Sequence, residues 1–135
     1  MHVFENDIYS IKDNLETNSS IVYFKQKNIS DEDLNDLIIL LNSNLELISP
    51  NHIVIYDATN LQFVSENQRK MMLDFINDSS QIISQKILFV IYIIPSKMLQ
   101  FVIKIVFAIS KPLFNYYVAK NLLDANIKIN KLRNL

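Results

Sequence analysis

The chain has 135 residues with a formal net charge of −1, and neither glycine nor cysteine occurs in it. That length favours one domain spanning residues 1–135, and the near-neutral charge argues against nucleic-acid binding, which normally needs a basic surface. The missing glycine excludes Gly-rich phosphate loops, and the missing cysteine excludes thiol catalysis and cysteine-ligated metals.

The first predicted elements are two strands and a helix. Alternating side chains predict strands at 8–12 and 21–27, joined by a turn that must use Asn, Asp or Ser in place of glycine. Ser30 is the expected N-cap of the helix, because acidic residues follow it and favour the positive helix end. Pro50 ends the pattern. The apolar positions at helical spacing are Leu34, Leu37, Ile38, Leu41, Leu45 and Ile48.

The middle of the chain predicts a strand, a helix and a second strand. The β-branched run at 53–57 is typical of a buried strand, and 58–64 connects it to a helix that begins with the capping-box pattern of Ser65 and Gln68. Met71 and Met72 belong to the expected inner face of that helix. The continuous apolar run at 87–94 is typical of a central strand covered on both faces.

The last third predicts a helix, an edge strand and a final helix. Ser96 can cap a helix at 97–109, which Lys111 and Pro112 interrupt before a strand at 115–119 and a helix at 120–132. The expected order is β-β-α-β-α-β-α-β-α. It indicates an α/β fold with a single mixed, mostly parallel sheet, an antiparallel opening pair and helices packed on it.

The element order from about residue 21 onward, with two local segments in it, resembles the SpoIIAA-like family, small bacterial domains grouped with the STAS and lipid-binding CRAL-TRIO folds. One is the strand at 53–57, which ends in Asp57 and leads through a loop into a helix. The other is Lys-Pro-Leu-Phe at 111–114, before the last strand and helix. The family's phosphorylatable serine falls on Glu66 here, and a fixed carboxylate cannot be a phosphate switch. The resemblance implies an apolar ligand, such as a fatty acyl chain, between helices and sheet.

The helix at 97–109 carries apolar residues around most of its circumference. Either neighbours bury it deeply, or the excess apolar surface faces a partner chain, an apolar ligand or a membrane surface. Our first hypothesis is a non-enzymatic interaction or regulatory domain, homodimeric or bound to another protein through this helix. The alternative is a carrier or sensor of an apolar ligand, for which flexible methionines would suit an adaptable cavity. The candidate residues are Met71, Met72, Met98, Phe101, Val102 and Ile105.

The chain offers no obvious catalytic or metal-binding set. His52 and His2 are the only histidines, and Asp57 lies about 16 Å from His52 along one predicted strand, too far to orient it in a triad. Asp57 itself ends a strand, where α/β ligand sites lie. The alternative is that it caps the following loop. We therefore expect that the protein is not an enzyme and that it binds neither a metal ion nor a cofactor.

The first residues lack the basic and apolar segments of a signal peptide, which favours a cytoplasmic protein. The stretch 87–109 is too interrupted by Pro95 and by lysines to span a membrane. Lys97, Lys104 and Lys111 recur every seven residues and would lie on nearly one helical face. That spacing allows peripheral membrane attachment at most.

Overall fold

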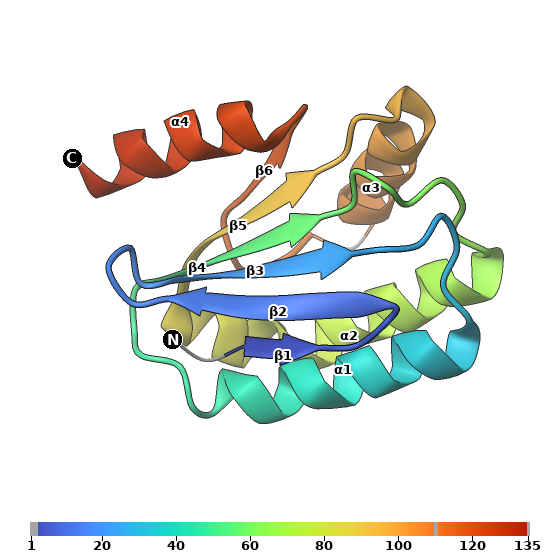
Figure 1. Ribbon diagram of the computed structural model, residues 1–135, viewed down its shortest axis with the longest axis horizontal. Helices are drawn as coiled ribbons and strands as arrows, with labels where there is room; N and C mark the ends of the chain where they lie inside the picture. Colours follow the sequence, from blue (N-terminus) through green and yellow to red (C-terminus); the bar gives the residue numbers. More distant parts are fainter. Residues whose placement is uncertain (1–2, 110, 135) are drawn as a thin grey trace.

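The described residues of this computed structural model, 3–109 and 111–134, form one six-stranded mixed sheet and four helices (Figure 1). His2, one of the two histidines, lies outside the described residues. The strands are β1 (Val3–Glu5), β2 (Tyr9–Asn14), β3 (Ser19–Phe24), β4 (His52–Asp57), β5 (Ile87–Ile93) and β6 (Tyr116–Ala119). The helices are α1 (Asp31–Leu45), α2 (Glu66–Lys86), α3 (Lys97–Ile109) and α4 (Leu122–Arg133).

The strands lie in the sheet in the same order as in the chain. The pairs β1–β2 and β2–β3 are antiparallel, whereas β3 to β6 are parallel to one another. Helices α1, α2 and α3 cover one face of the sheet, and α4 covers the other. The predicted α/β class and the antiparallel opening are therefore confirmed.

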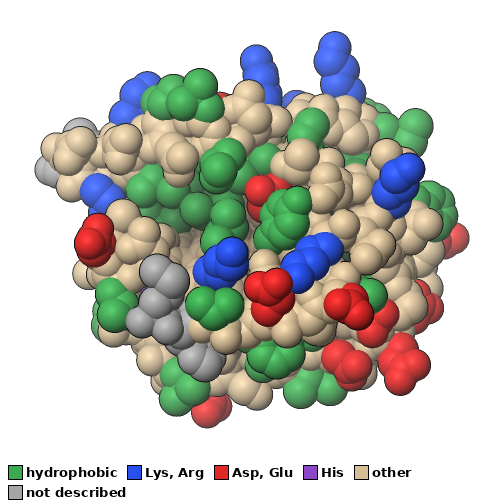
Figure 2. Space-filling view, in the orientation of Figure 1, with side chains coloured by type: hydrophobic (Ala, Val, Ile, Leu, Met, Phe, Trp, Pro, Cys, Tyr) green, Lys and Arg blue, Asp and Glu red, His purple; other side chains and the backbone are tan. Residues whose placement is uncertain are grey.

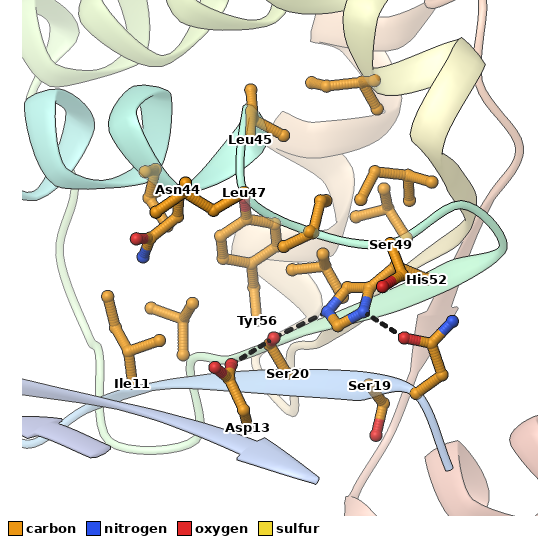
Figure 3. Close-up of a pocket in the computed structure, with 18 of the residues that line it drawn as sticks. Ile11, Asp13, Ser19, Ser20, Asn44, Leu45, Leu47, Ser49, His52 and Tyr56 are labelled. Atoms are coloured by element: carbon orange, nitrogen blue, oxygen red, sulfur yellow. Dashed lines mark hydrogen bonds between the residues drawn. The ribbon is translucent and has the colours of Figure 1, made fainter. Parts of the chain in front are cut away.

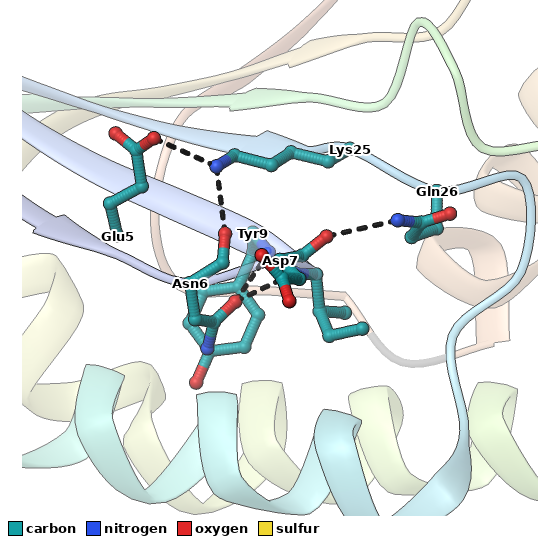
Figure 4. Close-up of polar contacts among 7 residues, drawn as sticks. Glu5, Asn6, Asp7, Tyr9, Lys25 and Gln26 are labelled. Carbon is teal, nitrogen blue, oxygen red and sulfur yellow. Dashed lines mark hydrogen bonds and ion pairs between the residues drawn. The ribbon is translucent and has the colours of Figure 1, made fainter.

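The predicted element order is wrong by one strand, because β1 precedes the two strands expected at the start. Three residues are too few to show alternation, so nothing local distinguishes β1 from an irregular segment. Its contacts are with β2 and with the residue after β3. The Phe4 ring stacks on Tyr9 at 5.9 Å between centroids. Lys25 forms an ion pair with Glu5 at 2.9 Å (Figure 4).

Asparagine replaces glycine in the turns, as expected. The Asn6 side-chain oxygen accepts hydrogen bonds from the backbone N–H groups of Ile8 and Tyr9, both at 2.8 Å, and turns the chain from β1 into β2. Asn18 before β3 and Asn51 before β4 adopt positive φ angles of 48° and 64°. Asparagine tolerates this left-handed region better than other residues with a β-carbon.

The helix caps predicted at Ser30, Ser65 and Ser96 are confirmed, whereas the last helix begins at Leu122 and not at residue 120. Ser30 accepts a hydrogen bond from the Asp33 backbone, and Ser65 and Gln68 form a reciprocal capping box. The Ser96 hydroxyl accepts from the Leu99 backbone N–H at 3.3 Å at the start of α3. Acidic side chains gather over the beginning of α1 at the lower right of the molecule (Figure 2), where they complement the helix dipole.

Several element boundaries differ from the prediction by up to three residues. Strand β3 ends at Phe24, because the chain then leaves the sheet toward α1, whereas the sequence pattern continued to residue 27. In α4, the apolar side chains of Leu122 and Leu123 are exposed. This helix packs through Ala125 and Ile129, which share a core cluster with β4, β5 and β6.

Helix α3 is attached to the sheet by Phe107 near its C-terminal end. The Phe107 ring lies 4.3 Å from Tyr116, 5.6 Å from Tyr92 and 6.5 Å from Phe114, measured between centroids. Tilted and edge-on rings at these distances are favourable beyond the area that they bury. This cluster joins α3 to β5, β6 and the loop between them.

Replacing Phe107 by alanine should lower the free energy of unfolding by about 3–5 kcal/mol, because it removes the buried centre of this cluster. The matched control is Phe101→Ala on the same helix, whose side chain is 64% exposed and should change stability by no more than about 0.5 kcal/mol. Urea unfolding of both variants measures the difference. Equal losses would mean that the cluster does not anchor α3.

Candidate functional site

Helix α3 is neither deeply buried nor apolar and exposed all round: it has an inner side against the protein and an outer side that faces solvent. Met98, Phe101 and Ile105 lie on the outer side with 78%, 64% and 43% of their surface exposed. Val102 is half-buried and faces inward. The sequence-predicted residues therefore do not form one surface: three face solvent and Val102 lines a cavity.

An apolar cavity of about 130 Å³ lies beneath α3, and we call it the α3 cavity. Met72 lines it, whereas Met71 packs against a neighbouring part of the core. Arg69 is the only charged side chain among the described residues that line it, and its guanidinium donates to the Val64 carbonyl. Other walls come from α1, α2, α3 and the sheet, through Phe24, Leu37, Phe75, Tyr92, Leu99 and Ile103.

Two stacked tyrosines bring polar atoms to this apolar space. The rings of Tyr56 and Tyr92, from neighbouring positions on β4 and β5, lie 5.4 Å apart and nearly parallel. Burial raises the pKa of both hydroxyls, so both stay protonated at neutral pH. Neither hydroxyl donates to another described residue. Because no fully enclosed side-chain oxygen or nitrogen among the described residues lacks a partner, both hydroxyls border open volume.

A second cavity, of about 320 Å³, opens at the C-terminal end of α1, where β3, β4 and β5 begin. We call it the histidine cavity. Tyr56 also lines it, together with other apolar residues that border the α3 cavity: Leu41, Phe75, Ile83 and Val90. The two cavities are therefore neighbours on the helix-covered face of the sheet, one largely apolar and one with a polar rim.

Four polar side chains meet at the rim of the histidine cavity (Figure 3). The Ser20 hydroxyl lies 2.6 Å from His52 Nε2 and 2.6 Å from Asp13 Oδ1. On the other side of the imidazole ring, Nδ1 lies 3.0 Å from Asn18 Oδ1. Asp13 and Ser20 are register partners on β2 and β3, and β4 brings His52 beside them.

The orientation of Asn18 determines which histidine nitrogen carries a proton. Its amide nitrogen donates to the Pro50 carbonyl at 3.0 Å, so its oxygen faces the imidazole. An oxygen can only accept, and therefore His52 Nδ1 is the N–H donor. In the neutral ring, Nε2 has a lone pair and can only accept, so Nε2 and the Asp13 carboxylate both face the single hydroxyl proton of Ser20.

His52 is buried, and this burial lowers its pKa from the ordinary value. The nearby Asp13 carboxylate acts in the opposite direction, and Arg133 adds a smaller lowering. The ring is therefore neutral at pH 7. A neutral imidazole hydrogen-bonded to a hydroxyl can exchange protons or orient a polar ligand group.

The Asp57 side chain forms hydrogen bonds within the loop that follows β4. Its carboxylate accepts hydrogen bonds from the backbone N–H of Thr59, at 3.0 Å, and from the Thr59 hydroxyl. This is the loop-capping alternative considered for it. The contacts of His52 with Asn18 and Ser20, and through Ser20 with Asp13, are not predictable from residues near His52 in the chain, because all three partners belong to the segment before α1.

No protein-family model, curated protein or solved structure matches this chain. The SpoIIAA-like resemblance therefore stays a prediction. Within residues 3–109 and 111–134, no helix is long and apolar enough to cross a membrane. The same residues contain no group of three or more His, Cys, Asp or Glu side chains placed to hold a metal ion.

The imidazole of His52 should titrate with a midpoint below the ordinary value of 6.5, because burial favours its neutral form. A folded-state pKa below the unfolded one contributes stability above about pH 6.5 and loses it as the pH falls. NMR titration in a His2→Gln background, with urea unfolding at pH 7 and pH 5, measures both effects. A midpoint above 6.5 would contradict the prediction.

Proposed function

We propose that this protein is a non-enzymatic binding domain whose α3 cavity takes an apolar ligand, such as a short acyl chain or the end of a longer one. The observation that carries the proposal is the cavity itself, enclosed by apolar side chains and bordered by the unpartnered hydroxyls of Tyr56 and Tyr92. Ligand sites of this kind combine an apolar lining with a few placed polar groups.

The size of the α3 cavity limits the bound group. About 130 Å³ is close to the roughly 150 Å³ of an engineered apolar cavity that binds benzene. A group of about six carbon atoms therefore suits the space. The tyrosine hydroxyls would donate to a single carbonyl or hydroxyl oxygen at the end of that group.

The way in which α3 packs on the sheet favours entry of a ligand into the α3 cavity near the N-terminal end of the helix. Phe107 fixes the helix near its C-terminal end, while the preceding turns contact the sheet through half-buried side chains such as Leu99, Val102 and Ile103. Met72 contributes a flexible, polarizable wall on α2. The ligand would enter between α2 and the first turns of α3.

A second candidate function is self-association through the outer side of α3. Met98, Phe101 and Ile105 are spaced by three and four residues, so they form one stripe along the helix. Contiguous exposed apolar side chains of this kind often mark a contact between proteins. A second copy of the chain could cover the stripe in a two-fold contact, with the same residues buried on both copies.

Adding 1-hexanol should shift the methyl signal of Met72 in a methionine-methyl NMR spectrum and leave that of the exposed Met98 in place. Val102→Phe should abolish the shift, because the added ring fills the cavity. Ile105→Phe is the matched control, since it adds the same ring on the outer side of α3. Loss of the shift in both variants, or in neither, would contradict the α3 cavity as the binding site.

Sedimentation velocity at micromolar concentration tests self-association. The unmodified chain should sediment as a dimer, and Phe101→Glu should convert it to a monomer by placing a charge in the contact. Phe63→Glu is the control, because Phe63 is similarly exposed, at 60%, but lies outside α3. A monomeric unmodified chain would exclude this second function.

A further inference from the structure

The polar cluster of the histidine cavity has one hydrogen-bond donor too few. The Nδ1 proton of His52 is used by Asn18, so the Ser20 hydroxyl proton is the donor that remains. Two acceptors compete for it at equal distance, His52 Nε2 and Asp13 Oδ1, both 2.6 Å from Ser20 Oγ. When the Ser20 hydroxyl donates its proton to one of these acceptors, the second acceptor lies against a lone pair of Ser20 Oγ, and no hydrogen bond joins the two atoms.

The charge around this cluster favours a cation as the missing donor. Asp13 forms no ion pair among the described residues. Lys12 is exposed and projects from the opposite face of β2, because successive side chains in a strand alternate. The Arg133 guanidinium donates to the backbone carbonyls of Thr17, Asn18 and Asn51 and is not directed at Asp13.

The C-terminal end of α1 also favours a cation in the histidine cavity. The histidine cavity lies at the C-terminal end of that helix, which carries partial negative charge. Asn44 and Leu45, in its last turn, line the cavity. The same end has Lys86 bound to the Glu46 carbonyl at 2.8 Å, but neither Lys86 nor Glu46 lines the cavity.

The cavity also has room for an apolar body next to the polar cluster. Its volume of about 320 Å³ is at the lower end of the range of small-molecule sites. Leu41, Leu45, Val54, Tyr56 and Ile87 provide an apolar wall beyond the polar rim. A ligand with one charged end and one apolar end matches this division.

We propose that the histidine cavity binds a small primary amine, with its ammonium group between Asp13 and Ser20 and its apolar body against Leu45 and Tyr56. The ammonium N–H groups donate to the Asp13 carboxylate and to a Ser20 lone pair. The Ser20 hydroxyl is then free to donate to His52 Nε2, so every acceptor in the cluster has a donor. A carboxylate of the same length has the opposite charge and no hydrogen-bond donor. An alcohol of the same length has no charge and only one donor.

Hexylamine, 1-hexanol and hexanoate, titrated while the ring signals of His52 are followed by NMR, test the proposal at pH 7. The amine should bind at least about tenfold more tightly than the alcohol, because it adds charge-assisted hydrogen bonds to a carboxylate. Hexanoate should not shift the His52 signals. Equal affinity for the three compounds would overturn the proposal.

Asp13→Asn is the decisive variant, because its amide N–H₂ supplies the missing donor within the chain. It should keep the thermal unfolding temperature of the parent protein or raise it, and it should lower amine affinity at least tenfold. Glu46→Gln is the control, since it removes a nearby exposed charge and should leave binding unchanged. An Asp13→Asn protein that binds hexylamine as tightly as the parent would contradict the proposed site.

This site and the α3 cavity share lining residues such as Tyr56, but they bind through different groups, and the two experiments separate them. Val102→Phe should leave the response of His52 to hexylamine unchanged, whereas it removes the response of Met72 to hexanol. Asp13→Asn should weaken the response of His52 to hexylamine and leave the response of Met72 to hexanol unchanged. Loss of amine binding in Val102→Phe would place the amine in the α3 cavity and overturn the assignment to Asp13 and Ser20.

Discussion

Right-handed crossovers between parallel strands in chain order determine where everything else in this molecule lies. Strands β3 to β6 follow one another across the sheet, so each connecting helix returns on the same face. Neighbouring strands are about 4.8 Å apart, whereas packed helices need about 8–10 Å. Three helices therefore occupy more width than the four strands that they connect. Helix α3 is last in this row, which explains why one of its sides has no neighbour among the described residues. Both cavities lie on the face of the sheet that these helices cover: α1 and α2 line both of them, whereas α3 lines only the α3 cavity.

The sequence predicts best the features that depend on neighbouring residues. The helix caps at Ser30 and Ser65 and the central position of the apolar strand at residues 87–93 all follow from local patterns, and the structure has them. Strand β1 could not be predicted in this way. Its three residues are held by contacts of Phe4 with Tyr9 and of Glu5 with Lys25, which lie outside the segment.

The candidate sites were harder to predict, for two different reasons. Helix α3 is apolar nearly all round, so periodicity could not show that Val102 faces a cavity while Phe101 faces solvent. The cluster around His52 depends on strand register: Asp13 and Ser20 are seven residues apart in the chain but directly opposite in the sheet. The orientation of His52 depends further on Asn18, whose positive φ angle is itself set by the turn before β3.

Arg133 joins the two faces of the sheet. It belongs to α4, on the face opposite the cavities, yet its guanidinium holds the carbonyls of Thr17, Asn18 and Asn51 at 2.8–3.1 Å. These carbonyls belong to the turns that enter β3 and β4, and Asn18 also orients His52. The Arg133 guanidinium therefore connects the C-terminal end of α4, on one face of the sheet, to the turn that orients the imidazole on the other face.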